Sequence, residues 1–564
     1  MPLNASEDVP AELWMGIFES MSTPADLYSV VRTCRAFYTY AIRPLHRHLI
    51  WKDALEVARN LPLWDDKPQM WTNVETLRLE VSTMPEYQGG VFVNVNGDEY
   101  TIDHVPQNGQ FSFTSALDPF FTVDRSYASQ ELYDRITHRI ATFSHLSEFT
   151  CKHILITDRF FSVIHTLPAL RKLHVENCIL PARNAIAQRD HSVLPITDLT
   201  LLNLRRRGAR VAFEHNHGHV HAQGHAHNHN QDDDAVHVLN LARAQNLRTL
   251  RVDTTADVFG RVFYVFDQVA GDFVYNTPAN LTKLYIDRRR LVTHERSSYF
   301  HNEANFPDRN VYGVISHCPT LRMISISQPF PQHTPFPSAS VGNMTCFEGL
   351  PEGVLLATHG KQMDAISILW SDLPSPILDT LAHIANQHPA LKMLAIECGT
   401  WDDEIIIAIS QLFKQLRRLK ITYQRGGPQE DTVVSLGPQY LAHCENLHTF
   451  HLLEAPHPKK VFSYLTATTT THHHGDLFTS PPVSPPVSPV FPSASCSPYL
   501  FDTSYDSIEQ EMRDLLIPWN RFCPTLREVQ LCRSWKMKRA FEGDNWRIEK
   551  VKESEYEAAE TFSF

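Results

Sequence analysis

The densest group of potential metal ligands in this sequence lies at residues 214–237, which contain eight histidines and three consecutive aspartates. Imidazole side chains in such numbers can bind zinc, copper or nickel. A structural zinc site needs a fixed tetrahedral set of ligands, whereas alternating His-x-His in a segment rich in Gly and Asn defines no such set. We therefore expect a His-rich loop at 214–237 rather than a metal site, and a metal-binding loop is the alternative.

Residues that could catalyse a reaction are not grouped in any common motif. The sequence lacks the GxxxxGK[ST] phosphate-binding loop, the HExxH zinc helix, the GxSxG nucleophile elbow and the kinase HRD and DFG motifs. Cys398 precedes Asp402, Asp403 and Glu404, but acidic residues directly after a strand usually begin a helix, and no base lies next to the thiol. The ten cysteines form no CxxC pair. The sequence therefore predicts no catalytic residue, no metal ligand and no cofactor.

The charge of the chain argues against two classes of partner. With 51 basic and 63 acidic residues, the formal net charge is −12, so the chain does not attract a phosphate backbone or an anionic bilayer. The arginine triplets at 205–207 and 288–290 are expected to be solvated turns. Neither a signal-peptide pattern nor a long apolar run is present. We expect no nucleic-acid partner, no membrane association, and an intracellular location in the cytoplasm, the nucleus or both.

Residues 9–51 carry more apolar side chains than a helical pair can bury within itself. Pro10 and Pro24 each suit the first turn of a helix, which predicts helices through AELWMGIFESM and ADLYSVVRTCRAFYTYA. Pro44 is expected to interrupt the second helix and to open a third short one, PLHRHLIW, that ends near Trp51. The apolar residues of the first helix occupy more than one face, so a second face must be covered by the rest of the chain or by a partner.

The order and spacing of these residues resemble the F-box. The matching positions are Val9-Pro10, Glu12-Leu13, Ile17-Phe18, Met21, Asp26-Leu27, Val30-Val31, Cys34-Arg35 and Phe37, with Val9 standing where the family more often has Leu. The resemblance implies a three-helix domain, residues 1–52, that docks on the adaptor subunit of an SCF-type, cullin-based ubiquitin ligase. The adaptor-binding residues that it implies are Val9, Pro10, Glu12, Leu13, Ile17, Phe18, Met21, Leu27, Val30, Cys34 and Phe37.

A six-residue pattern, apolar-x-x-apolar-x-apolar, recurs along the rest of the chain. Such a pattern predicts a short strand, followed by a helix that returns the chain to the next strand. Several neighbouring copies are 24 to 28 residues apart, as expected for leucine-rich repeats. The copies begin at Val74, Leu146, Leu170, Ile196, Leu247, Leu281, Leu321, Met363, Leu391, Leu416, Leu447 and Leu526.

These copies resemble the divergent leucine-rich repeats that follow F-boxes in many fungal proteins. The resemblance implies an α/β fold in which the F-box is followed by a horseshoe-shaped solenoid over residues 70–564. Only the copy at Leu170 has the consensus Asn or Cys after the strand, at Cys178. Hydrogen bonding along a ladder at that position is therefore not expected.

Three segments interrupt the predicted solenoid. Residues 83–125 contain alternating apolar residues around Asn96-Gly97, which indicates a hairpin-like insertion. The second is the His-rich loop at 214–237. Residues 466–498, rich in Pro, Ser and Thr, can bury little and are expected to form a flexible loop. Their four Ser-Pro pairs are interpreted as low-complexity drift, with phosphorylation sites as the alternative.

The F-box resemblance implies a substrate receptor without catalytic groups of its own. The F-box would bind the adaptor and, through it, the cullin, while the repeats would hold a protein substrate near an E2 carried by other subunits. The alternative is a non-enzymatic leucine-rich-repeat scaffold with no role in ubiquitination, whose N-terminal helices cap the solenoid.

Strand geometry predicts where the substrate would bind. In the six-residue pattern the last two apolar residues face the core, so the residues that follow each of them point to the opposite, concave face. In the central copies these are Arg251, Asp253, Tyr285 and Asp287. Arg, Tyr and carboxylates are common anchors of protein interfaces. We expect these four side chains to bind the substrate, and loops at the strand ends are the alternative.

Overall fold

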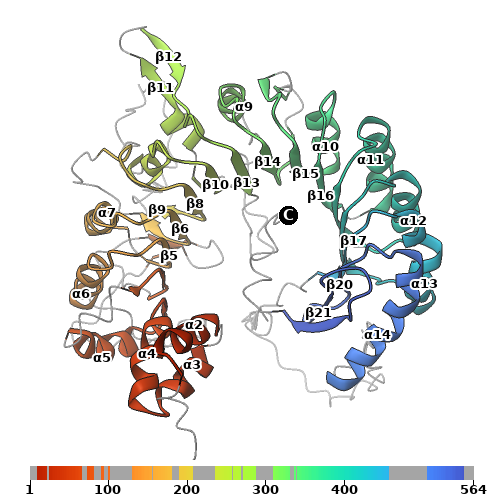
Figure 1. Ribbon diagram of the computed structural model, residues 1–564. Coiled ribbons are helices and arrows are strands. Elements are labelled where there is room, and N and C mark those ends of the chain that lie inside the picture. Colours follow the sequence, from red (N-terminus) through yellow and green to blue (C-terminus); the bar gives the residue numbers. More distant parts are fainter. Residues whose placement is uncertain are drawn as a thin grey trace, which may run out of the picture. The chain divides into compact units, whose positions relative to one another are not determined.

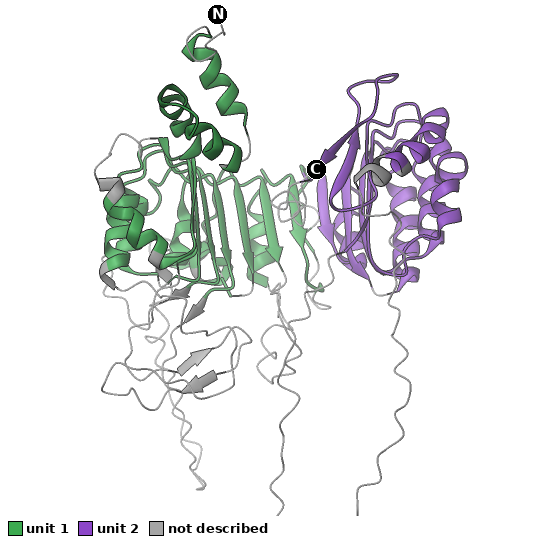
Figure 2. Cartoon of the chain, turned by 90° about the horizontal axis from the view of Figure 1, so that it is seen from below, with its two compact units in different colours: residues 1–343 green, residues 344–564 purple. Residues whose placement is uncertain are grey.

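The computed structural model describes residues 9–21, 24–65, 73–81, 91–93, 99–101, 130–154, 156–180, 190–206, 236–253, 255–256, 258–267, 271–287, 309–330, 336–337, 340–371, 373–455 and 505–551. The predicted Pro-rich loop at 466–498 lies outside these residues, as does the predicted His-rich loop up to residue 235. The chain divides into two compact units, residues 1–343 and 344–564 (Figure 2).

A parallel sheet forms the centre of the first unit, and the helices lie on one side of it (Figure 1). The strands follow one another in the order β1 (His48–Trp51), β2 (Thr76–Leu79), β5 (Glu148–Lys152), β6 (Lys172–Glu176), β8 (Asp198–Leu202), β10 (Thr249–Asp253), β13 (Lys283–Asp287) and β14 (Met323–Ile326). The helices that return the chain are α5 (Ala54–Asp65), α6 (Gln130–Ile140), α7 (Asp158–His165), α8 (Val236–Leu239) and α9 (Arg309–Ser316).

The same backbone contact begins each repeat and fixes the register of the sheet. The amide of Arg171 donates to the carbonyl oxygen of Ser147, that of Thr197 to Arg171, and that of Arg248 to Thr197, each at 2.8 Å. Along the strands, buried aliphatic residues such as Leu173 alternate with partly exposed polar ones. The alternation arises because successive side chains of a strand point to opposite faces, and only one face is covered by helices.

The second unit repeats this architecture. Its parallel strands are β15 (Cys346–Gly349), β16 (Ala365–Ser371), β17 (Met393–Thr400), β18 (Arg418–Arg425), β19 (Thr449–Glu454) and β20 (Glu528–Gln530), followed by antiparallel β21 (Trp535–Lys538) and β22 (Arg547–Lys550). Its helices are α10 (Pro351–Thr358), α11 (Pro374–Gln387), α12 (Asp403–Leu412), α13 (Glu430–Ser435) and α14 (Tyr505–Phe522).

The predicted α/β class is confirmed, and each of the twelve predicted six-residue patterns contains one of these parallel strands. Among the parallel strands, β1 and β15 were not predicted, and the antiparallel strands β21 and β22 were not predicted either. The sequence of β15 carries Gly349 where the pattern requires its last apolar residue, and β1 lies in a segment that was expected to be helical.

Among the described residues, three helices precede β1: α2 (Ala11–Ser20), α3 (Pro24–Val31) and α4 (Arg35–Leu45). The prediction of one continuous helix after Pro24 is wrong. The backbone of Cys34 is extended, with φ −155° and ψ 166°, and its Sγ accepts the amide hydrogen of Phe37 at 3.5 Å, which starts α4.

The predicted third short helix from Pro44 to Trp51 is also wrong. Pro44 lies in the last turn of α4, and the four residues from His48 form β1. Leu49 and Trp51 are buried there while the residues between and before them are exposed. This period of two matches a strand and not a helix.

Smaller pieces of sheet complete the first unit. Within the predicted hairpin insertion at 83–125, β3 (Val91–Val93) pairs antiparallel with β4 (Glu99–Thr101), and the rest of that insertion lies outside the described residues. β7 (Ile179–Leu180) pairs with β9 (Arg205–Arg206), and β11 (Tyr264–Asp267) forms a two-stranded hairpin with β12 (Asp272–Tyr275). Among the described residues, no helix combines the length and apolar character needed to cross a bilayer.

Candidate protein-interaction surfaces

The three N-terminal helices share a hydrophobic core of their own. Phe18, Leu27 and Ala41, one from each helix, are buried at its centre. Trp14 and Phe37 pack against them, with ring centroids 4.6 Å apart, and Phe18 meets Phe37 edge-on at 5.3 Å. The apolar residues of this cluster all lie between Trp14 and Leu45. The helices are therefore held together locally rather than by the core of the sheet.

The same helices expose large apolar side chains on their outer surface. Leu13 is 59% exposed, Ile17 is 47% exposed and Tyr28 is 56% exposed. Because Leu13 and Ile17 are four residues apart in α2, they lie on one face of that helix. We call Leu13, Met15, Ile17, Tyr28 and Tyr38 the N-terminal apolar set.

The predicted adaptor-binding residues divide between this outer surface and the core. Phe18 and Leu27 are buried, because a short amphipathic helix needs its most buried stripe for its own packing, and they support the predicted surface from beneath. Those exposed are Pro10, Glu12, Leu13, Ile17 and Cys34. Those partly buried are Val9, Met21, Val30 and Phe37.

The predicted adaptor-binding residues do not include three members of the N-terminal apolar set, Met15, Tyr28 and Tyr38. They lie at positions that the F-box resemblance did not match. The sequence could have identified them, because they are apolar residues that lie outside the main apolar stripe of each helix.

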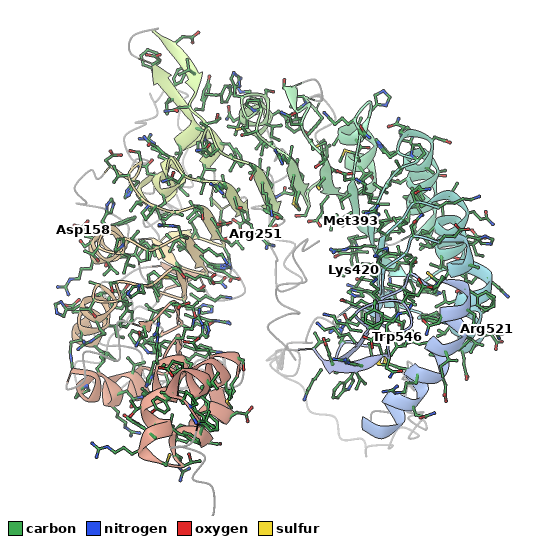
Figure 3. All side chains as sticks on the ribbon, viewed as in Figure 1. Asp158, Arg251, Met393, Lys420, Arg521 and Trp546 are labelled. Carbon is green, nitrogen blue, oxygen red and sulfur yellow. The ribbon has the colours of Figure 1, made fainter. Side chains whose placement is uncertain are left out.

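Three of the four predicted substrate-binding residues form one cluster on the uncovered face of the first sheet. The Nε of Arg251 lies 2.5 Å from Oδ2 of Asp287, and its Cζ lies 5.8 Å from the centre of the Tyr285 ring. The hydroxyl of Tyr285 in turn donates to Sδ of Met323 at 3.3 Å. Figure 3 shows Arg251 on the face of the sheet away from Asp158, which lies on the helical side.

Asp253 does not belong to this cluster, and its prediction as a substrate-binding residue is wrong. Its side chain is buried, where Oδ2 accepts the amide hydrogen of Asn203 at 2.7 Å and Oδ1 accepts that of Thr255 at 2.9 Å. Burial raises the pKa of the carboxyl. Asp253 therefore ties the chain after β8 to the chain after β10, a loop-bracing role that strand alternation could not reveal.

Elsewhere the sheet faces hold their charges in pairs. Glu176 accepts hydrogen bonds from His174 at 2.9 Å and from Lys152 at 2.7 Å, and these contacts lower its pKa to about 2 although burial opposes them. In the second unit, burial acts to raise the pKa of Glu528, but the hydrogen bond from His451 at 2.9 Å helps to lower it to about 2. A surface of paired opposite charges suits a protein better than a polyanion.

The isolated thiol that could have been a nucleophile is not activated. Cys398 is buried, its Sγ donates to the carbonyl oxygen of Thr422 at 3.6 Å, and burial raises its pKa to about 12. Asp402 instead caps α12 by accepting the amide hydrogen of Glu404 at 2.9 Å. Within the described part of the chain, no three His, Cys, Asp or Glu side chains are grouped as metal ligands would be.

Comparisons with known proteins provide no family for this chain. No protein-family model matches the sequence, and no curated protein matches it. Among solved structures, a chain from "Crystal structure of TLR13-ssRNA13 complex" is similar at 13% sequence identity and a TM-score of 0.27. The match covers 55% of this chain and 39% of that chain. A TM-score this low does not establish a shared fold or function.

Proposed function

We propose that this chain is the substrate-recognition subunit of an SCF-type cullin-RING ubiquitin ligase. Its N-terminal helices dock as an F-box on the adaptor subunit, and its repeats, of the leucine-rich type, bind a protein substrate. The observation that carries the proposal is that α2, α3 and α4 complete a core of their own and still expose the N-terminal apolar set. Exposed apolar groups at this density are typical of a surface that a partner covers.

The local core favours docking over capping. Helices that only capped the solenoid would place their apolar side chains against its first repeat. Here the buried cluster contains residues of the three helices, and Leu13 and Ile17 remain about half exposed. Covering each of these two side chains would contribute about 1 kcal/mol to binding.

In this function the chain contributes position rather than chemistry. The adaptor and cullin would bring an E2 that carries ubiquitin close to a substrate held by the repeats. This proximity raises the effective concentration of the acceptor lysine. The paired charges and the cluster of Arg251, Tyr285 and Asp287 are compatible with a protein ligand on the sheet face.

Two aspartates in place of Leu13 and Ile17 test the docking surface. We expect the Leu13→Asp/Ile17→Asp double variant to bind the purified adaptor at least about 100-fold more weakly in a pull-down titration, because a carboxylate cannot be buried without a partner. The helical circular dichroism should stay unchanged, since neither side chain belongs to the core. Ile517→Asp, at a 63% exposed position of α14, is the matched control and should bind normally.

Wild-type affinity of the double variant would contradict docking through this surface. It would favour the alternative, an interaction scaffold of leucine-rich repeats without a role in ubiquitination.

A further inference from the structure

The hairpin of β11 and β12 carries four aromatic rings on one face. Tyr264 is paired with Tyr275, and Phe266 with Phe273, in the antiparallel register. Directly opposed residues of a hairpin point to the same side, and so do residues two apart along a strand. All four rings therefore share a face. Figure 1 shows the hairpin projecting from the first unit beside α9.

The rings form a continuous strip. Successive ring centroids are 5.2 Å apart from Phe266 to Phe273, 5.0 Å from Phe273 to Tyr264, and 5.1 Å from Tyr264 to Tyr275. The strip ends on the imidazole of His317, which stacks on Tyr275 at 4.9 Å. We call these five residues the aromatic strip.

One end of the aromatic strip is anchored and the other is open to solvent. Tyr275 lies directly over Gly313 of α9, where any Cβ would collide with its ring. The hydroxyl of Thr277 donates to the carbonyl oxygen of His317 at 3.1 Å. At the open end, Phe266 is 54% exposed and Phe273 is 52% exposed. The rings are thus held in place without being covered.

Acidic groups flank the open end. Asp267 and Asp272 oppose each other across the last pair of the hairpin. Asp272 is exposed at this end, so a cationic group placed beside it would be attracted to its carboxylate. A cationic group next to the exposed rings would also gain from their π faces. The charge and the aromatic surface therefore point to one kind of ligand.

We propose that the aromatic strip binds an extended, proline-rich segment of another protein that carries Arg or Lys beside its prolines. Such segments adopt polyproline II helices, which lose little entropy on binding and pack their rings on aromatic surfaces. One turn of that helix, about 9 Å, is somewhat longer than the roughly 7 Å between the two ring-bearing pairs, which are two residues apart along each strand. The acidic flank selects against anionic ligands, including nucleic acid.

This surface is separate from both surfaces of the proposed receptor. It lies beside α9 on the helical side (Figure 1), whereas Arg251 lies on the other side of the sheet (Figure 3) and the N-terminal apolar set lies on α2, α3 and α4. The proposal stands whether or not the chain serves in a ubiquitin ligase.

Fluorescence anisotropy with the full chain tests the proposal. The probe is a labelled peptide of repeated Arg-Pro-Pro triplets, compared with peptides of Glu-Pro-Pro and of Arg-Ala-Ala triplets. We expect saturable binding of the first peptide and at least about tenfold weaker binding of the other two, because each lacks one of the two matching features. Equal binding of the Arg-Ala-Ala peptide would overturn the proposal in favour of simple charge attraction.

Variants locate the binding on the hairpin. Asp272→Asn and Phe273→Ala should each weaken binding of the Arg-Pro-Pro peptide by about tenfold or more. The asparagine keeps the side-chain acceptor for the Phe273 amide. Phe541→Ala, at a comparably exposed phenylalanine of the second unit, should leave it unchanged.

A thermal melt shows whether each variant remains folded. Full binding by folded Asp272→Asn and Phe273→Ala overturns the proposal. So does concentration-dependent dimerisation in light scattering that Phe273→Ala abolishes, because a second copy would then be the ligand of the strip.

Discussion

Each large polar side chain in the Arg251 cluster already has a partner within the sheet. Arg251 is bound to Asp287 and lies over Tyr285, so it is preorganised rather than free. A substrate that binds there must add contacts to this pair or replace one member of it. Both routes favour a protein surface whose own charges alternate, because a ligand of one sign would leave one partner uncompensated.

Removing the cluster should separate substrate binding from adaptor binding. We expect the Arg251→Ala/Tyr285→Ala/Asp287→Ala variant to capture the substrate more than about tenfold less, since large anchors of this type carry most of an interface's energy. Quantitative mass spectrometry of proteins that co-purify with wild type and variant measures the loss. The adaptor in the same samples is the control and should remain constant. Unchanged capture would move the substrate to the loops at the strand ends.

The lowered pKa of Glu176 predicts how the stability of the first unit changes with pH. Its pKa is lowered to about 2 in the folded state, so its stabilisation is complete above the ordinary carboxyl pKa of about 4.3 and is lost as the pH falls from there toward 2. Because the side chain is about a quarter exposed, we expect this contribution to be about 1 kcal/mol.

Urea unfolding of wild type and Glu176→Gln measures this effect. The wild type should be more stable at neutral pH, and the difference should shrink below about pH 4. Glu19→Gln, at an exposed position of α2, should show no such difference. A pH-independent gap between wild type and Glu176→Gln would contradict an ionic origin.

At the scale of elements, buried core residues and the exposed residues proposed for docking are neighbours along the same short segment of the N-terminal helices. Phe18 directly follows Ile17, yet one is buried and the other exposed. Substitutions at these two positions should therefore have different effects. Phe18→Ala removes the central ring of a small core and should cost about 3 kcal/mol, enough to unfold a domain of this size.

Adaptor binding by Phe18→Ala should fall together with the helical signal of the three helices, measured by hydrogen exchange of residues 11–45. Ile17→Asp should lose binding while those amides stay protected. If Phe18→Ala keeps both its protection and its binding, the core described for these helices is not what holds the docking surface in place.

The repeat pattern was a reliable guide to the sheet because it states the physical requirement of each strand. A strand covered on one face needs apolar residues at alternate positions, and the twelve copies that have them are strands. β15 was not predicted because Gly349, which has no side chain, occupies the buried position where the pattern requires an apolar residue. β1 escaped because its four residues were assigned to the helix expected after Pro44.

The site residues were less predictable because burial depends on neighbours that sequence spacing does not specify. Asp253 stands at a position of β10 where the alternating pattern predicts a surface residue, but the loops after β8 and β10 close over it. The β11–β12 hairpin was missed as well. Its signal is the aromatic alternation in FYVFDQVAGDFVY on either side of a turn containing Gly271, whose φ of +67° suits glycine.

At the scale of the whole molecule, the two units repeat one architecture of parallel strands with helices on one side. The first unit also carries the N-terminal helices and the aromatic hairpin. One chain therefore presents several candidate surfaces on a stable repetitive scaffold, an arrangement suited to bringing proteins together. Its net charge of −12 provides no overall attraction to a phosphate backbone.

The central claim, that the N-terminal helices dock on the ubiquitin-ligase adaptor, is tested most directly by calorimetric titration of purified adaptor into the intact protein. We predict one-to-one binding with a Kd of about 1 µM or below and a negative heat-capacity change, as expected when apolar surface is buried. No binding heat, together with no co-elution at concentrations of about 100 µM, would contradict the claim.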